Sequence, residues 1–283
     1  MKDLPDQFEK IEMNYIDIPD ARLCYIKKGS GPAIVFIHGF CLDRRSWENQ
    51  INFFSDNFTC IAVDLRGFGN SSFPSDNAYA HYEDINALLH ILQINQPVIL
   101  VGLSMGARVV ANFALAYPQK TKAIIFVDGI IDGYICKDFN LDYIYKAGKE
   151  KGIAVANNLW LDHQLFEQAR KNPASAKLLT DMVMSYSGWH WLNKNPVKSL
   201  NPPAIEQVKN LTVPTLIITG QYDIPDFQDI AQLLHTEINH SIKKEIAGAG
   251  HMCTIEMPTD FNEIVNQFLI QLTAIDVPKT QDR

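Results

Sequence analysis

A serine flanked by glycines is the feature of this sequence with the clearest chemical meaning. Residues 102–106 read Gly-Leu-Ser-Met-Gly, directly after the apolar run 97–101 and at the start of the helical pattern 105–117. A strand that turns at once into a helix strains its central residue and leaves no room for side chains two positions to either side. The glycines provide that room, and the helix amino terminus favours developing negative charge. The spacing predicts that Ser104 is a nucleophile, the alternative being an ordinary glycine-rich turn.

An alcohol is a poor nucleophile near neutral pH, so Ser104 requires a base. His251 stands in the small-residue loop 248–251, after the last strand pattern and before the last helical pattern. From such a loop an imidazole can reach the carboxyl edge of a parallel sheet, and we predict that His251 is the general base. Six other histidines lie in helical, inserted or charged surroundings and are predicted to be surface or core residues: His81, His90, His163, His190, His235 and His240.

The base in turn requires an acid that orients it. Asp223 follows the apolar run 213–219, at the end of a strand where ligand-facing residues of parallel sheets collect. Asp226 lies where the next helix begins and is better explained as a cap or first-turn acid. Asp128 ends another strand and could also reach His251, so it stays open as an alternative. We predict that Asp223 is the orienting acid.

Acyl transfer passes through tetrahedral intermediates, which need preorganised N–H donors. One such donor is the main chain of Met105, at the start of the nucleophile's helix. A second is expected after the run 33–37, where Gly39 allows the loop to bend so that the N–H of Phe40 faces the same oxygen. We therefore predict an oxyanion hole formed by Phe40 and Met105, with His38 as a structural residue of the loop.

The elements that position these residues alternate between short apolar runs and amphipathic stretches. Buried runs of this kind are typical of parallel strands covered by helices on both faces, which indicates an α/β fold with an eight-stranded, mostly parallel sheet. The first two strands are close enough to form a hairpin. Strands are expected at 11–18, 21–27, 33–37, 59–63, 97–101, 122–127, 213–219 and 241–246, and helices near 44–55, 78–93, 105–117, 227–237 and 258–272.

The strand rhythm stops between residues 130 and 205, where the sequence holds only helical patterns. We predict a core formed by residues 1–129 and 206–283, with residues 130–205 inserted as a helical cap or lid. The insertion contains three tryptophans, which either face a substrate cleft or fill a helical core: Trp160, Trp189 and Trp191.

Composition narrows the classes of partner. The chain has 283 residues, 47% hydrophobic and 20% charged, as expected for a globular protein. With 25 Lys and Arg against 32 Asp and Glu, its net charge of −7 disfavours nucleic acid and anionic membranes. Five cysteines without a Cys-x-x-Cys pair suggest neither a disulfide framework nor zinc. We expect a cytoplasmic monomer or homodimer with no cofactor, metal or membrane partner, since no apolar stretch approaches about 18 residues.

Together these pieces resemble the α/β-hydrolase family over nearly the whole chain. The matching segments are His38-Gly39-Phe40, Asp-Leu-Arg-Gly-Phe-Gly-Asn-Ser at 64–71, the pentapeptide 102–106, Gly-Gln-Tyr-Asp at 220–223 and Gly250-His251. Their order of nucleophile, acid and base is that of the family. The resemblance implies an α/β-hydrolase fold, and a structural loop at 64–71 in which Arg66 forms an internal ion pair.

Within the family, residues 102–106 and 222–227 are similar to 3-oxoadipate enol-lactonase-like and carboxylesterase-like members. The resemblance implies a cofactor-free serine hydrolase that cleaves a small-molecule ester or lactone through an acyl-enzyme. Perhydrolases, C–C bond hydrolases and a ligand receptor on the same fold remain alternatives. Dehalogenases and epoxide hydrolases are disfavoured, because they attack saturated carbon with a carboxylate, whereas Ser104 would leave an inert ether.

Overall fold

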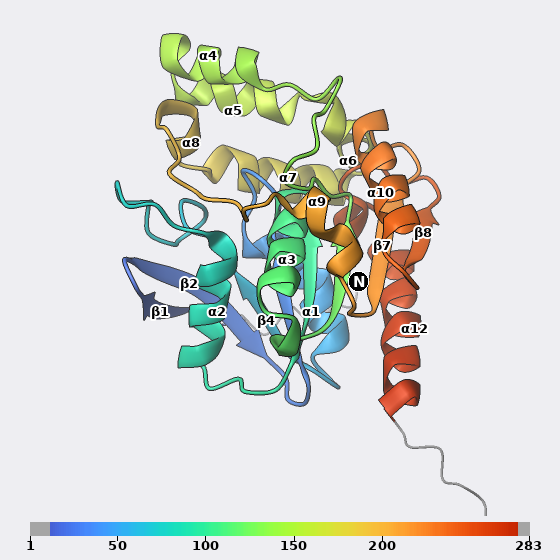
Figure 1. The fold of residues 1–283 in the computed structure, drawn as a ribbon. Coiled ribbons are helices and arrows are strands. Elements are labelled where there is room, and N and C mark those ends of the chain that lie inside the picture. The colour runs from blue at the N-terminus through green and yellow to red at the C-terminus, as the bar shows by residue number, and fades with distance from the viewer. Residues whose placement is uncertain (1–11, 277–283) are drawn as a thin grey trace, which may run out of the picture.

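The protein forms one sheet with helices on both of its faces. The structure is a computed structural model that describes residues 12–276 (Figure 1). The sheet has eight strands in the order β1-β2-β4-β3-β5-β6-β7-β8. β1 and β2 form an antiparallel hairpin, β2 pairs antiparallel with β4, and all further neighbours are parallel. This confirms the predicted mostly parallel α/β architecture.

The strands are β1 (Asn14–Ile18), β2 (Ala21–Lys28), β3 (Ala33–Ile37), β4 (Thr59–Val63), β5 (Val98–Leu103), β6 (Thr121–Val127), β7 (Thr215–Gly220) and β8 (Ile242–Ile246). Every residue of β5 and β7 is buried, as expected for strands covered on both faces. β7 begins two residues later than predicted. Pro214 precedes it and lacks the N–H that a central strand donates to its neighbour.

The helices that flank the sheet are α1 (Glu48–Phe54), α2 (His81–Ile91), α3 (Met105–Ala116), α10 (Pro225–Glu237), α11 (Cys253–Glu256) and α12 (Pro258–Asp276). The predicted helix near 44–55 is divided, because Arg44–Trp47 forms a 3-10 turn before α1 begins. None of the helices described is long and apolar enough to cross a bilayer.

Between β6 and β7 the chain adds no strand to the sheet within the region described. It holds α4 (Asp142–Lys151), α5 (Ile153–Leu161), α6 (Glu167–Lys171), α7 (Pro173–Ser185), α8 (Trp189–Leu192) and α9 (Ala204–Gln207). We call residues 130–205 the helical insertion. In Figure 1, α4, α5 and α8 lie together at the top of the molecule, beyond the sheet.

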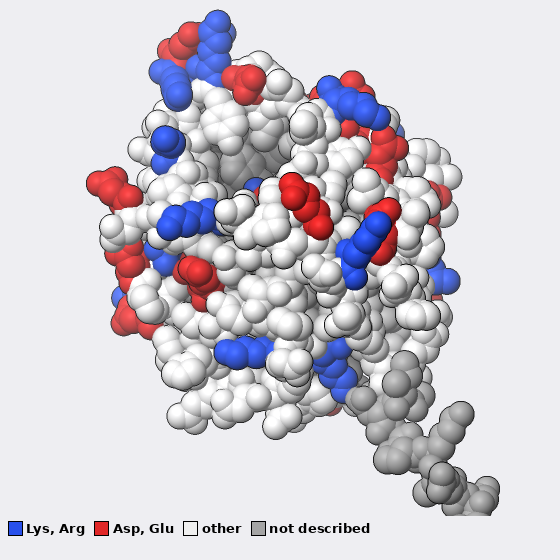
Figure 2. All heavy atoms as spheres, viewed as in Figure 1, with Lys and Arg blue, Asp and Glu red and all other residues white. Residues whose placement is uncertain are grey.

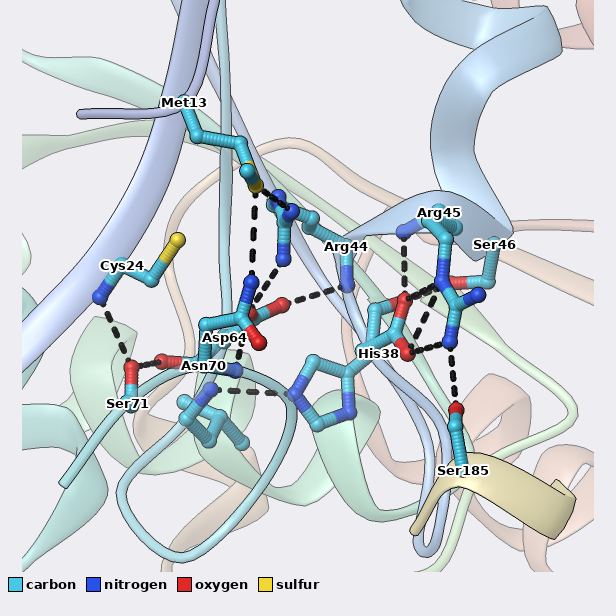
Figure 3. A network of polar contacts seen from close by, with 12 residues as sticks. Met13, Cys24, His38, Arg44, Arg45, Ser46, Asp64, Asn70, Ser71 and Ser185 are labelled. Atoms are coloured by element: carbon cyan, nitrogen blue, oxygen red, sulfur yellow. Dashed lines mark hydrogen bonds and ion pairs between the residues drawn. The ribbon is translucent and has the colours of Figure 1, made fainter. Parts of the chain in front are cut away.

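Buried ion pairs hold the loops that follow β3 and β4 (Figure 3). The Asp64 carboxylate accepts hydrogen bonds from the Arg44 backbone N–H at 2.8 Å, the Arg44 guanidinium at 2.5 Å and the Asn70 N–H at 2.8 Å. Arg66 donates to Asp84 at 2.8 and 3.1 Å, which confirms the expected internal ion pair. Because each pair is hydrogen-bonded in low dielectric, removing one partner would leave a buried charge unpaired.

His38 joins these two loops. Its Nε2 accepts the N–H of Leu65 at 3.0 Å, so Nδ1 carries the proton and donates to the Gly39 carbonyl at 2.7 Å. Burial lowers the pKa of His38, which favours this neutral form. His38 therefore has the structural role predicted for it.

Close backbone contact at the elbow gives a first testable prediction. A methyl group on Gly102 would lie 2.3 Å from the Gly106 carbonyl oxygen, whereas one on Gly152 meets no atom within 4 Å. Gly102→Ala should therefore lower the free energy of unfolding by about 3 kcal/mol or more, because backbone must move. Gly152→Ala, the control, meets no such clash and carries only the backbone strain of its φ of 92° and ψ of 167°, about 1 to 3 kcal/mol, so it should lose less than Gly102→Ala. Chemical denaturation measures both, and equal losses would contradict the elbow contact.

Candidate active site

Ser104 occupies a strained turn between β5 and α3. Its φ of 56° and ψ of −114° lie outside the regions that residues with side chains favour. Its own N–H donates to the Val127 carbonyl of β6 at 2.9 Å, which fixes the turn to the sheet. A methyl group on Gly106 would lie 2.1 Å from the Ile37 carbonyl oxygen, so only glycine allows this approach. The strain is stored where the surrounding backbone holds it in place.

Asp223 and His251 lie in contact. Nδ1 of His251 is 3.0 and 3.1 Å from the two carboxylate oxygens of Asp223. The loops that carry them touch, because a methyl group on Gly220 would lie 2.0 Å from the Gly250 carbonyl oxygen. The Tyr222 N–H also donates to the Ala249 carbonyl at 2.8 Å. The imidazole is 3% exposed, so a carboxylate holds it in a nearly dry site.

Ser104 belongs to the same edge of the sheet as this pair. It follows β5, Asp223 follows β7 and His251 follows β8, and the carboxyl ends of these parallel strands face the same way. No hydrogen bond joins Ser104 to His251 among the residues described. Such contacts often tighten only in the substrate complex. The structure thus brings the predicted acid and base together, and their link to the serine stays a prediction.

The N–H groups of Phe40 and Met105 are free to bind an oxygen. Neither donates a hydrogen bond to another residue in the part of the chain described. A methyl group on Gly39 would lie 3.3 Å from Cβ of Ser104, so the loop after β3 touches the elbow. Met105 is the first residue of α3, where backbone N–H groups lack partners within the helix.

A cavity of about 290 Å³ lies over Ser104, and Figure 2 shows the surface hollowed below the end of the molecule that carries α4 and α5. The sheet side contributes Phe40, Ser104, Met105 and Arg108 to its wall, and the insertion contributes Ile130, Phe139, Leu141, Tyr145, Trp160, His190, Asn193, Asn195 and Val197. A larger hollow of about 880 Å³ borders Ala33, Thr59 and Thr121, where strands begin, and is remote from the nucleophile candidate.

Comparison with known proteins identifies the family. The sequence model of the alpha/beta hydrolase fold matches residues 32–258, which is most of the chain. The protein belongs to the alpha/beta hydrolase fold family. The matched range includes the elbow, the Asp223 loop and His251, so the resemblance seen in the sequence is confirmed at the level of family.

The names of individual relatives of this alpha/beta hydrolase fold protein describe different reactions. A putative 2-succinyl-6-hydroxy-2,4-cyclohexadiene-1-carboxylate synthase of Bacillus subtilis is 27% identical, covering 85% of this chain and 91% of that protein. The bifunctional epoxide hydrolase 2 of Sus scrofa is 24% identical over 89% of this chain, which is 54% of its own length. The enol-lactonase of Burkholderia xenovorans LB400 has the same fold, with a TM-score of 0.78 at 19% identity, covering 91% of this chain and 100% of that one.

Several polar residues of the cavity were missed by sequence analysis, among them His190 and Arg108. His190 is buried, in line with the prediction of a surface or core residue, and it also lines the cavity and stacks on Phe68 with 4.4 Å between ring centroids. Burial, followed by the charge of Arg108, lowers the pKa of His190 to about 3, so the ring is neutral. No helical pattern indicates which insertion residues face inward. The position of Arg108 at the cavity could have been inferred from the sequence, because it lies four residues after Ser104 and therefore on the same helix face.

Two of the three tryptophans of the insertion, Trp160 and Trp191, take the two predicted roles, whereas Trp189 is partly exposed and is not among the residues that line the cavity. Trp160 lines the cavity, where its ring meets that of Phe40 at 6.0 Å. Trp191 is fully buried and donates to the Asn157 side chain at 2.8 Å, as a core residue does. Helical periodicity alone does not distinguish these roles, because both residues are buried.

Asp128 lies beside Asp223 rather than replacing it. One carboxylate oxygen accepts the Gly220 N–H at 2.8 Å, while the other has no donor among the residues described. Asp128 is fully buried and contacts Asp223 and the Cys253 thiol. Burial, and then the negative charge of Asp223, raises the pKa of Asp128 well above its ordinary value of 3.8. A protonated Asp128 can donate to Asp223 where a charged one would repel it.

Asp128→Asn tests this assignment, because an amide mimics a protonated carboxyl and tolerates the φ of 41° at this position. The raised pKa costs the wild type stability as pH rises above 3.8, because folding must then take up a proton. Asp128→Asn should gain on the wild type by up to about 1.4 kcal/mol per pH unit in that window. Thermal unfolding from pH 4 to pH 8 measures the difference. If Asp128→Asn is as unstable as Asp128→Leu at every pH, the ionised carboxylate of Asp128 is needed and the assignment of a neutral Asp128 is wrong.

Asp226 anchors the start of the insertion. It lies in the first turn of α10, as predicted, but its carboxylate accepts the backbone N–H groups of Lys137, Asp138 and Phe139, each at 2.8 Å. Burial opposes ionisation, yet these three donors lower the pKa of Asp226 below its ordinary 3.8. Because Phe139 lines the cavity, this carboxylate fixes one of its walls.

Asp226→Asn should destabilise this anchor by about 3 kcal/mol, because the amide NH2 that replaces one carboxylate oxygen would face a backbone N–H donor and the charge is lost. The wild-type advantage should be complete above pH 3.8 and shrink as pH falls through the lowered pKa. Unfolding curves and amide exchange at residues 137–139 measure it. Asp229→Asn is the control, since its exposed pair with the Lys137 ammonium at 3.3 Å contributes little. Equal exchange in both variants would rule out the anchor.

Proposed function

We propose that this protein is a serine hydrolase that cleaves a small carboxylic ester or lactone through an acyl-enzyme intermediate. The observation that carries the proposal is the strained Ser104 at a cavity wall, on the sheet edge where Asp223 contacts His251 at 3.0 Å. A nucleophile elbow, an acid and base pair, and free N–H donors are the parts that acyl transfer requires.

In the proposed reaction, His251 removes the proton of the Ser104 hydroxyl while the oxygen attacks the carbonyl carbon. The N–H groups of Phe40 and Met105 stabilise the negative charge that develops on the carbonyl oxygen. His251 then protonates the leaving alcohol, which in a lactone remains attached to the acyl group. A water that His251 deprotonates releases the acid, and Asp223 keeps the imidazole oriented and supports its charged form.

Serine chemistry favours this reaction over epoxide opening, although one relative is named an epoxide hydrolase. Attack on an epoxide carbon by Ser104 would form an ether, which has no acyl carbon for water to attack. A carboxylate nucleophile avoids this problem, but the elbow residue is serine. The enol-lactonase with the same fold is consistent with an ester or lactone substrate.

Ser104→Ala should reduce turnover of a small ester by about 10³-fold or more while thermal unfolding stays unchanged, because the parts of a triad act as a unit. A fluorophosphonate probe should label the wild type at residue 104 and leave the variant unlabelled. Ser30→Ala is the control, since that serine is exposed and precedes β3, at the edge of the sheet opposite to Ser104. Full ester turnover in Ser104→Ala, or a folded wild type that the probe does not label, would falsify the proposal.

A further inference from the structure

Arg108 places a cation in the cavity beside the candidate nucleophile. It lies on α3, and its backbone N–H points to the Ser104 carbonyl at 3.4 Å, so it is one helical turn beyond that serine. Residues four apart on a helix have Cβ atoms about 6 Å apart on one face. The Arg108 side chain is 24% exposed and borders the cavity.

The N–H donors of the Arg108 guanidinium make no hydrogen bond to the part of the protein that the structure describes. The contact of the guanidinium with a carboxylate is to Asp132, at 3.6 Å, which is too long for a hydrogen bond. Asp132 is also held by the Asn112 side chain at 2.7 Å. Among the residues described, no group accepts a hydrogen bond from the Arg108 side chain. A partly buried guanidinium in this state lacks the acceptors that would repay its desolvation.

Structural arginines of the same chain are paired differently. Arg66 donates two hydrogen bonds to Asp84, at 2.8 and 3.1 Å, and Arg45 donates to both carboxylate oxygens of Asp43, at 2.6 and 2.9 Å. These bidentate pairs satisfy the planar fork of the guanidinium. Within residues 12–276 Arg108 has no such bidentate partner, although it faces a cavity large enough for a small ligand.

The Asp132 carboxylate, 3.6 Å from Arg108, is not part of the cavity wall. Apart from Arg108, the residues of the wall are apolar or neutral, and no Asp or Glu is among them. Burial lowers the pKa of His190, and the positive charge of Arg108 lowers it further. The charge of Arg108 therefore influences another residue of the cavity wall. Asn195 accepts bonds from the Tyr79 hydroxyl and the Val197 N–H at its side-chain oxygen, which leaves its amide N–H₂ as a second donor.

We propose that Arg108 binds a carboxylate of the substrate. The substrate class is then an ester or lactone that carries a second, anionic carboxylate a few carbon atoms from the reacting carbonyl. This inference rests on the proposed hydrolysis at Ser104 and specifies its substrate. Arg108 acts as a specificity-determining residue, because it pairs with a charge that uncharged esters lack.

Two matched esters test the proposal. Monoethyl glutarate and ethyl pentanoate have the same leaving group and acyl length and differ in the terminal carboxylate. In a pH-stat assay the wild type should have a kcat/KM at least about 10-fold higher for monoethyl glutarate, the range that a charged hydrogen-bonded pair supplies. Arg108→Gln should lower the ratio of the two kcat/KM values by about 10- to 100-fold, and Arg108→Lys should lower it less.

A second variant separates this effect from general electrostatics. Lys146→Gln removes a positive charge from the exposed side of α4, where Lys146 lies 4.0 Å from Glu150, and it should leave the ratio at the wild-type value. A wild type that prefers ethyl pentanoate, or an Arg108→Gln variant with an unchanged ratio, would overturn the proposal. A ratio that falls equally in Lys146→Gln would also overturn it.

Binding without turnover keeps the inference distinct from the proposed reaction. Titration calorimetry of the Ser104→Ala protein should show binding of monoethyl glutarate that is at least about 10-fold tighter than that of the uncharged ethyl pentanoate and is lost when Arg108→Gln is added. Binding of monoethyl glutarate by a wild type that hydrolyses neither ester would support the anion site and reject the hydrolase. Ester hydrolysis together with equal binding of the two esters would reject the anion site alone.

Discussion

The close approach of two backbone segments around Ser104 is the constraint on which the remaining geometry depends. Gly102 and Gly106 meet within the elbow, and Gly106 meets the end of β3, at separations that no Cβ allows. This packing joins β5, α3 and the loop that carries Phe40 into one rigid unit. The strained φ of the serine persists because all of these contacts would have to open to relax it. A preorganised oxyanion site therefore follows from backbone packing, without dependence on side-chain identity at positions 40 and 105.

The site joins a part supplied by the sheet edge and a part supplied by the helical insertion. The sheet edge supplies the acid and base loops, which lock through the contact of Gly220 with Gly250. The insertion supplies most of the cavity wall, and it is tied to the core by the Asp226 carboxylate through three backbone donors. Because those bonds go to main chain, the residues at 137–139 can vary without loss of the anchor. The chemistry and the specificity are thus held by different interactions.

Features that depend on local sequence could be predicted. Buried strands read as continuous apolar runs, and the glycine spacing around Ser104 has a steric cause, so the sheet and the elbow could be predicted. The pairing of Asp223 with His251 followed from strand ends meeting at one edge. The partner of Asp226, the neutral state favoured at Asp128 and the cavity position of His190 were not predictable, because each depends on segments far apart in the chain. Helical periodicity reports that a residue is buried, not which surface it faces.

Helix α3 unites two kinds of positive potential in the cavity. Its amino terminus presents unpaired N–H groups at the serine, and one turn later Arg108 adds a full charge. The first acts on charge that develops during acyl transfer, whereas the second acts on charge that a ligand carries from the start. Attraction between Arg108 and a ligand's fixed charge acts equally on the ground state and the transition state, so it improves binding. It raises the rate only by positioning the carbonyl against the nucleophile. In a chain with a net charge of −7, a cavity wall whose described residues include no Asp or Glu leaves the charge of Arg108 available to an anionic ligand beside Ser104.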